Sequence, residues 1–360
     1  MLTCIKMATN LRSSLPISAL ISTILLSSLI STPSIATNTS KIDVLDDGQD
    51  KHTKERILYI EAKKAFDNKD LQGYQALKAQ LTTYPLYPYL SYAELSRLLD
   101  IRQQAAKTSK YGVTATSNRD KKAITQFITL HNKSYLGDRL RSKWLDYLAE
   151  QKNWQDYKRY YQDSVKKTEL KCFHLQAQLY TGEPLDVSAV DQLWLSNRSQ
   201  PNACNPVFAE WKKQGLLTPQ KLWQRYTLAV DKNNTSLAKY VQKSMNSSDS
   251  YLADLYLKVH KSPQAVKEVK SRTRKTSPND IASQRIVDII EHGLYRYAYR
   301  QPEETYQLYK QFKKTYAFTE QASTRLNQRI AKQLISQDNI ALASPLLKQM
   351  ASDDRADQVE

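Results

Sequence analysis

The chain has 360 residues, only 7 of them glycine, and its 53 Lys and Arg residues against 36 Asp and Glu residues give a net charge of +17. Because glycine costs a helix about 1 kcal/mol relative to alanine, its scarcity favours helices and argues against glycine-rich phosphate loops, tight β-hairpins and most compact α/β enzyme cores. The length allows one large domain or two.

The first 36 residues have the organisation of a secretory signal peptide. Lys6 and Arg12 form a basic region, the apolar run "SLPISALISTILLSSLI" follows, and "STPSIA" ends in a small-x-small pattern at Ala36. This order predicts export, with cleavage between Ala36 and Thr37. An uncleaved membrane anchor is the alternative, although the run is short for a span and carries several serines. No later stretch is apolar for long enough to cross a bilayer, so we expect a soluble body without a stable anchor after cleavage.

The positive charge points to a class of partner. Cleavage after Ala36 removes two positive charges and no negative ones, which leaves a net charge of +15. An exported protein is not expected to meet nucleic acid, whereas long-range attraction favours an anionic polymer of the cell envelope. The alternative is that the charge serves solubility alone.

The cysteine count changes with cleavage. Cys4 leaves with the leader, so Cys172 and Cys204 are left as an even pair in an oxidising compartment. This predicts a disulfide between them. Two free buried thiols are the alternative.

The remaining chain is predicted to be all-α. Residues 37–51 are polar and are expected to form a disordered leader, whereas residues 52–360 read as short amphipathic helices joined by short polar turns, with no strand pattern between them. The many helices, about sixteen, and their short connections favour an irregular α-solenoid over a globular helical bundle. The predicted helices are 56–66, 71–81, 121–131, 134–149, one beginning after 153, 168–180, 184–196, 206–214, 218–231, 235–245, 250–258, 263–272, 278–291, 302–314, 319–336 and 339–351.

The stretch "TYPLYPYLSYAEL", residues 83–95, interrupts this pattern with four tyrosines and two prolines. The preceding helix must stop before Tyr84, because a residue before proline disfavours helical geometry. Pro88 is tolerated in the first turn of the next helix, whose buried stripe is predicted to contain Leu90, Ala93 and the pair Leu95 and Leu98. We expect the tyrosines to pack between helices. Stacking of exposed tyrosines on sugars is the alternative.

Two stretches are more specific than this periodicity, namely "YPLYPYL" at residues 84–90 and "LWLSNRSQPNACNPVFAEW" at residues 193–211. Together with the leader and the helical body, they resemble the N-terminal half of the periplasmic soluble lytic murein transglycosylases, which cleave peptidoglycan glycan strands and form 1,6-anhydromuramic acid ends. The resemblance covers roughly residues 52–360 and weakens after about Asn234. It implies a U-shaped superhelix that closes into a ring, carrying a small lysozyme-like catalytic domain. The family pairs the cysteine of "SQPNAC" with an upstream cysteine, and Cys172 fits that place.

The family's catalytic motifs are missing from this sequence. No Glu-Ser dipeptide occurs, and neither a Gly-Leu-Met-Gln-type nor an Ala-Tyr-Asn-Ala-Gly-type segment is present. We therefore expect the chain to hold a leader and part of the superhelix of a truncated or fragmentary enzyme, with no catalytic residue, no cofactor and no activity of its own. Its expected partners are peptidoglycan glycan strands, bound weakly by charge, and cell-wall enzymes. A stand-alone periplasmic α-solenoid that binds or scaffolds is the alternative function.

Other candidate residues support no second chemistry. None of the histidines has a partner at i+4 or a carboxylate at metal-ligand spacing, so no metal site is predicted. Glycoside cleavage needs a carboxylic acid of raised pKa in an enclosed site, and the glutamates lie in charged helical faces or in the first turn of a helix. The residues in question are His52, His131, His174, His260, His292, Glu150, Glu169, Glu210, Glu303 and Glu304.

Two basic clusters, "RDKK" at residues 119–122 and "KSRTRK" at residues 270–275, lack the interleaved aromatics that bind single-stranded nucleic acid. We expect solvated turns. Contacts with envelope peptides or phosphates are the alternative.

Overall fold

The computed structural model describes residues 47–108, 116–272 and 281–350. The predicted signal peptide, its cleavage site between Ala36 and Thr37, and most of the polar leader lie outside these residues. Contacts divide the chain into two units, residues 1–57 and residues 58–360. Within the described part of the chain all regular structure is helical, so the all-α prediction is confirmed.

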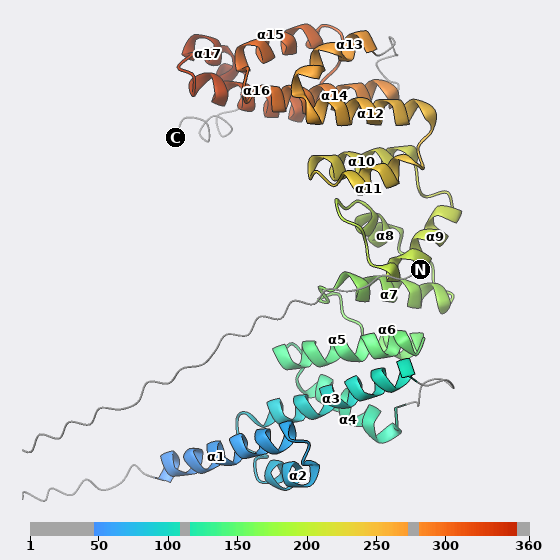
Figure 1. The fold of residues 1–360 in the computed structure, drawn as a ribbon, viewed down its shortest axis with the longest axis vertical. Helices are drawn as coiled ribbons and strands as arrows, with labels where there is room; N and C mark the ends of the chain where they lie inside the picture. The colour runs from blue at the N-terminus through green and yellow to red at the C-terminus, as the bar shows by residue number, and fades with distance from the viewer. Residues whose placement is uncertain (1–46, 109–115, 273–280, 351–360) are drawn as a thin grey trace, which may run out of the picture. The chain divides into compact units, whose positions relative to one another are not determined.

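The helices follow one another with short connections (Figure 1). Their bounds are α1 Asp47–Asp67, α2 Leu71–Ala79, α3 Tyr87–Thr108, α4 Asn118–Leu130, α5 Tyr135–Glu150, α6 Trp154–Tyr160, α7 Thr168–Tyr180, α8 Val187–Trp194, η1 Asn202–Cys204, α9 Asn205–Lys213, α10 Pro219–Asp231, α11 Thr235–Gln242, α12 Ser247–Lys261, η2 Pro263–Glu268, α13 Val269–Arg272, α14 Ile281–Tyr297, α15 Pro302–Lys313, α16 Glu320–Ile335 and α17 Ile340–Lys348, where η marks a 3-10 helix. None of the described helices combines the length and the apolar character that a membrane crossing needs.

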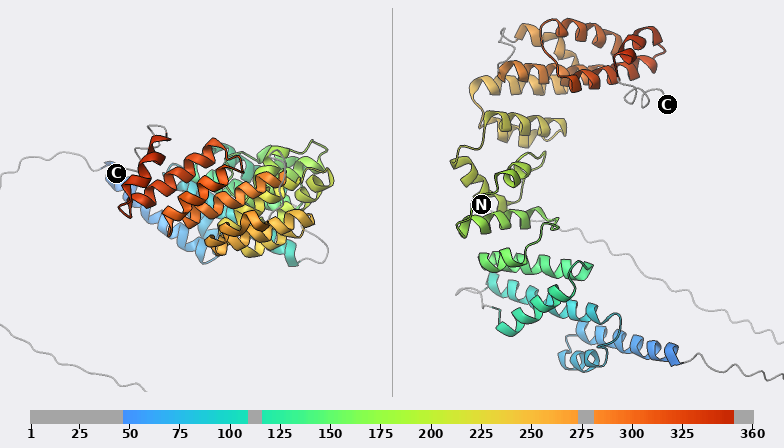
Figure 2. Two further views of the ribbon diagram at one scale, coloured as in Figure 1. Left: turned by 90° about the horizontal axis from the view of Figure 1, so that it is seen from above. Right: turned by 180° about the vertical axis from the view of Figure 1, so that it is seen from behind.

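Within residues 58–360 the main contacts join helices that are one or two places apart in the chain. For example, α5 packs on α3, α4, α6 and α7, and α14 packs on α12, α15 and α16 (Figures 1 and 2). Among the described residues, three hydrophobic clusters accordingly follow one another along the chain, around Tyr74, Trp144 and Trp211. Contacts concentrated between nearby helices are the signature of a solenoid, because in a globular bundle distant helices share one core.

Buried tyrosines tie successive layers together. The hydroxyl of Tyr74 donates to the carbonyl oxygen of Leu90 at 2.8 Å, and the hydroxyl of Tyr157 donates to that of Leu170 at 2.7 Å. The hydroxyl of Tyr226 repeats the arrangement on Ala253 at 2.7 Å. All three tyrosines are fully buried, so each ring fills the core while its hydroxyl binds the backbone of a later helix.

The tyrosines of residues 83–95 mostly pack, as expected. Tyr84 lies 5.7 Å from the ring of Tyr59, and Tyr84 and Tyr87 both pack against the first cluster. Tyr92 is half-buried, whereas Tyr89 is 48% exposed. Helix α3 begins at Tyr87, so Pro88 occupies its first turn as predicted.

The predicted buried stripe of α3 is partly wrong. Leu90 is buried, but Ala93, Leu95 and Leu98 are only half-buried. The deeper position is Leu99, which is fully buried in the second cluster. The reason is that α3 serves two clusters at once, so no single stripe along it points to one core.

Gly293 lies inside α14, although the predicted helix ended just before it at residue 291. A Cβ atom at this position would come within 2.6 Å of Val259 Cγ1 and 2.8 Å of Val266 Cβ. Glycine here therefore does not end the helix; it allows α12 and η2 to approach α14 closely.

The substitution Gly293→Ala tests this approach. Alanine improves helix propensity by about 1 kcal/mol, but overpacking against two β-branched side chains costs about 1 to 3 kcal/mol, so we expect a net loss of stability in urea unfolding. In the double variant Gly293→Ala/Val266→Ala, the two changes should cost less than the sum of the single variants, because truncating Val266 relieves part of the overlap. A single variant more stable than the parent protein would refute the close approach.

Candidate functional site

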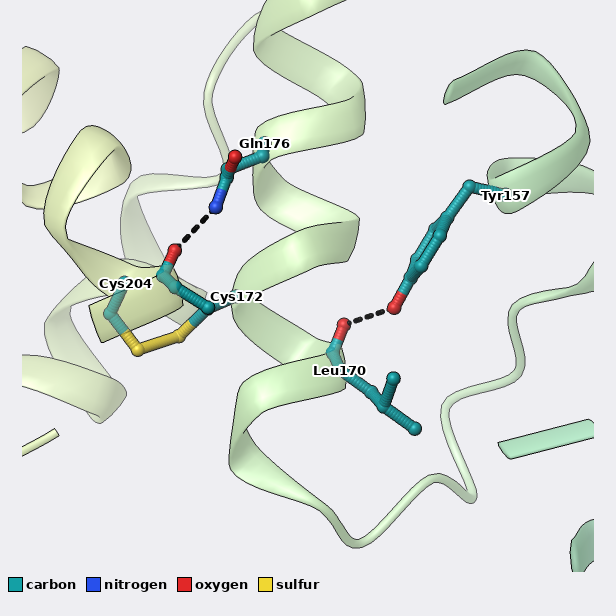
Figure 3. The surroundings of a disulfide bond; sticks show 6 residues. Tyr157, Leu170, Cys172, Gln176 and Cys204 are labelled. Atoms are coloured by element: carbon teal, nitrogen blue, oxygen red, sulfur yellow. Dashed lines mark hydrogen bonds between the residues drawn. A yellow bond between two sulfur atoms is a disulfide. The ribbon is translucent and has the colours of Figure 1, made fainter. Parts of the chain in front are cut away.

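The segment "SQPNAC", residues 199–204, is fastened to α7 by a disulfide. Cys172 lies in α7 and Cys204 ends η1; both are fully buried, and their Cα atoms lie 4.8 Å apart. Near the disulfide, Gln176 Nε2 donates a hydrogen bond of 2.5 Å to the carbonyl oxygen of Ala203 (Figure 3). The predicted pairing is therefore present, and a hydrogen bond adds to the anchorage of the segment.

Aromatic rings pack beside this segment. The ring centroid of Trp194, at the end of α8, lies 5.3 Å from those of Phe208 and Trp211 in α9. Trp211 is fully buried and donates from Nε1 to Asp191 Oδ1 at 3.1 Å. The stretch that made the sequence distinctive is thus a packed and cross-linked junction between α7, α8 and α9.

The same segment lines a pocket of about 300 Å³. Ser199 and Gln200 come from the segment, Asn205 follows it, and Arg225 of α10 and Tyr240 of α11 contribute further to the wall. Sequence reasoning missed Arg225, because a single arginine in a helical pattern gives no signal of its own. This pocket is the candidate binding site.

A larger groove of about 1070 Å³ runs beside Tyr87 and Arg119. Its other charged residues form ion pairs. Lys78 Nζ lies 2.5 Å from Glu94 Oε2, and Arg102 Nη2 lies 3.2 Å from Asp120 Oδ2. Because these charges are already paired, the groove offers little free charge with which to select a charged ligand.

The basic clusters fit the solvated interpretation where they are described. Arg119 and Lys122 are exposed, and Lys121 forms an ion pair of 2.6 Å with Asp156. Of the cluster at residues 270–275, only residues 270–272 are among those the structure describes.

The candidate glutamates do not meet in an enclosed site. Glu150 and Glu303 are exposed, Glu169 lies 3.2 Å from Lys167, and Glu210 lies 3.7 Å from Lys213. Hydrogen bonds from Lys267 and then Tyr297 lower the pKa of Glu304, which is the opposite of what a general acid needs.

Carboxyl groups with raised pKa occur elsewhere. Burial raises the pKa values of Asp146, Asp288 and Glu291. Each has a structural partner: Asp146 binds Lys167 at 2.9 Å, Asp288 accepts from Trp223 Nε1 at 2.7 Å, and Glu291 pairs with Arg325 at 3.1 Å. Each therefore acts as a link between elements.

Two of the five histidines meet in the core, although their spacing in the sequence gave neither of them a partner. His260 Nδ1 lies 3.0 Å from His292 Nε2, and His260 Nε2 lies 2.9 Å from Asn233 Oδ1. His292 Nδ1 lies 3.3 Å from Asp231 Oδ1, which also accepts from Tyr256 at 2.8 Å. The chain of contacts joins α10, α12 and α14, and burial lowers the pKa values of both histidines.

Asp231, His260 and His292 could hold a metal ion, since their ligand atoms lie within 4.8 Å of one another. However, both nitrogens of each ring already face a protein partner. A metal would have to replace the contact between the two histidines, so a hydrogen-bonded cross-link accounts for the group without an ion.

Comparisons with known proteins place the chain beside one class of enzymes. It is 26% identical over 214 residues to the soluble lytic murein transglycosylases of Escherichia coli K12 and Salmonella typhimurium LT2, which covers 59% of this chain and 30% of each relative. The chain thus spans about a third of the length of these relatives. A family model described as Cucumovirus coat protein matches residues 153–266, less than a third of the chain.

Solved structures agree with the first of these matches. An inactive mutant of the lytic transglycosylase Slt from Pseudomonas aeruginosa is similar with a TM-score of 0.65 and 28% identity, over 81% of this chain and 44% of that one. The 70-kDa soluble lytic transglycosylase in complex with bulgecin A gives a TM-score of 0.62 at 22% identity, over 83% of this chain and 46% of that one. Over 214 residues the chain is homologous to the soluble lytic murein transglycosylases, and it shares their all-α superhelical fold.

Proposed function

We propose that this protein is the superhelical portion of a periplasmic lytic transglycosylase, which cleaves peptidoglycan glycan strands to 1,6-anhydromuramic ends. Residues 1–36 are the signal peptide, residues 37–51 a polar leader, and residues 52–360 the solenoid that positions the enzyme on peptidoglycan. The observation that carries the proposal is the similarity to these enzymes over 214 residues, which agrees with the resemblance of the disulfide-anchored segment at residues 199–204.

Two further features support it. The leader predicts export, and a net charge of +15 after its removal suits the anionic envelope. Because the sequence lacks the family's catalytic motifs, we place the chemistry in a lysozyme-like domain outside these 360 residues. Sequencing the genomic DNA after codon 360 distinguishes this proposal from the alternative, a stand-alone scaffold. An unrelated sequence after a clean stop would favour the scaffold.

The mature protein, purified after export, is expected to bind isolated sacculi weakly and to release no anhydromuropeptides. A positioned acid supplies several orders of magnitude in glycosidic cleavage, and none of the candidate glutamates lies in an enclosed site. Binding that rests on net charge should fall as salt shortens the Debye length from about 10 Å at 0.1 M to about 3 Å at 1 M.

A digest of the same sacculi by an active lytic transglycosylase, which forms the anhydro ends, serves as the positive control for product detection. Anhydromuropeptides that disappear on Glu210→Gln or Glu303→Gln would refute the placement of the chemistry outside this chain. Saturable binding that persists at high salt would refute a purely electrostatic contact. Absence of binding at low salt would count against the positioning role.

A further inference from the structure

The pocket beside residues 199–204 contains a buried positive charge without a counter-charge. Arg225 is only 3% exposed, and its guanidinium carbon lies 4.0 Å from the centroid of the Trp194 ring. Among the described residues neither Nε nor Nη1 of Arg225 has a hydrogen-bond partner, and the same holds for Trp194 Nε1. Three buried N–H donors are thus carried by two residues that line one pocket.

Arg225 differs from the other buried arginines of this chain. Arg141 is equally buried, and it donates to Asp138 at 2.7 Å and to Asn132 at 2.8 Å. Arg285 is also 3% exposed and forms an ion pair with Asp249. A buried charge without an acidic partner is unfavourable, and the stacking of Arg225 on Trp194 compensates it only in part. Arg225 is therefore the buried arginine of these three that a bound anion would stabilise most.

The surroundings of Arg225 favour an anion. Of the described residues that line the pocket, none is acidic. Helix α9 begins there with Asn205, and no acidic side chain caps its first turn. Burial lowers the pKa of Arg225 to about 10, so the side chain still carries its charge at neutral pH.

We propose that this pocket binds a carboxylate, held by the Arg225 guanidinium, which lines the pocket and stacks on the ring of Trp194. The planar fork of arginine matches the two oxygens of a carboxylate. One buried cation matches one negative charge: Lys212 lies 5.2 Å from the Trp194 ring but does not line the pocket, so nothing on its wall balances the second charge of a phosphate dianion.

The uncharged polar residues around Arg225 indicate what the rest of the ligand is like. Ser199, Asn205, Ser236 and Tyr240 are exposed polar residues around the buried arginine, and about 300 Å³ accommodates a group of the size of a dipeptide. We assign the carboxylate to the end of a peptidoglycan stem peptide, whose D-alanine terminus has this chemistry. This source rests on the proposed function, whereas the carboxylate site itself does not.

Calorimetric titration of the mature protein with D-alanyl-D-alanine tests the site. We expect saturable binding of the free acid, none of its C-terminal amide, and a loss of about 10- to 100-fold in Arg225→Gln, because a charged hydrogen bond is removed. Equal binding of acid and amide, or unchanged affinity in Arg225→Gln, would overturn the site, and so would tighter binding of inorganic phosphate than of the dipeptide. Equal affinity for L-alanyl-L-alanine would keep the carboxylate site and reject the peptidoglycan source.

A stability measurement separates a binding role from a structural one. If Arg225 waits for a ligand, Arg225→Met keeps most of its packing on Trp194, removes an unpaired charge and should raise the Tm of the ligand-free protein. The matched control Arg141→Met removes an equally buried arginine that is hydrogen-bonded to Asp138 and Asn132, and it should lower the Tm. A fall in Arg225→Met as large as that in Arg141→Met would overturn the proposal. The titration uses free dipeptide and the Tm comparison uses no ligand. Their results are therefore independent of whether the protein binds sacculi, which tests the proposed function.

Discussion

Removing the Cys172–Cys204 disulfide should lower the free energy of unfolding by about 3 to 4 kcal/mol, the loop-entropy value for a closed loop of 32 residues. The loss should exceed that from most single substitutions, because the bond joins α7 to the start of α9 across two turns and α8. In a solenoid each layer contacts only its neighbours, so a loosened junction is not compensated by distant helices.

Urea unfolding of the oxidised protein and of Cys172→Ala/Cys204→Ala measures the effect. Reductant should destabilise the parent protein by a similar amount and leave the double variant unchanged, which separates the cross-link from packing losses. Thiol titration of the denatured, unreduced mature protein should find no free thiol. Two reactive thiols would show that the pairing does not form in solution.

Acidification below pH 6.5 should destabilise the protein through His292. Burial, and then the neighbouring charges of His260, Arg296 and Arg325, lower the pKa of His292 from 6.5 to about 3. Between these values the unfolded chain binds a proton that the folded protein does not, so stability falls as the pH falls, by about 1.4 kcal/mol per pH unit. At about pH 4.5 the loss from this residue reaches about 2 to 3 kcal/mol, and His260 adds to it in the same direction.

The carboxyls of Asp288 and Glu291 act against this trend, because burial raises their pKa values and protonation then favours the fold. Comparison with His292→Gln therefore isolates the histidine. The variant should be less stable than the parent protein at about pH 7.5 by about 1 to 3 kcal/mol, and the difference should shrink on acidification. Parallel stability curves for the two proteins would exclude His292 as the titrating group. Histidine proton shifts in NMR provide the direct check.

Much of the candidate site could be foreseen from local sequence, but its charged centre could not. The even cysteine count predicted the disulfide, and "SQPNAC" marked the segment that lines the pocket. Arg225 gave no such signal, since other arginines of similar burial, such as Arg141, only stabilise the fold. What distinguishes Arg225 is the lack of an acidic neighbour in space, and that depends on how α8, α9, α10 and α11 come together.

The sequence alone determined the helical class, the succession of short helices and the cysteine pairing, because helix periodicity, capping residues and turn residues act within a few neighbouring positions. Where two helices touch was decided only by the tertiary structure. His260 and His292 are 32 residues apart in the chain, and their ring nitrogens meet at 3.0 Å. Gly293 lies in mid-helix because two valines pack where a larger side chain would stand. The physical reason is that such contacts depend on the rotation and spacing between layers. Those quantities are set by side-chain packing along whole helices, and no local pattern encodes them.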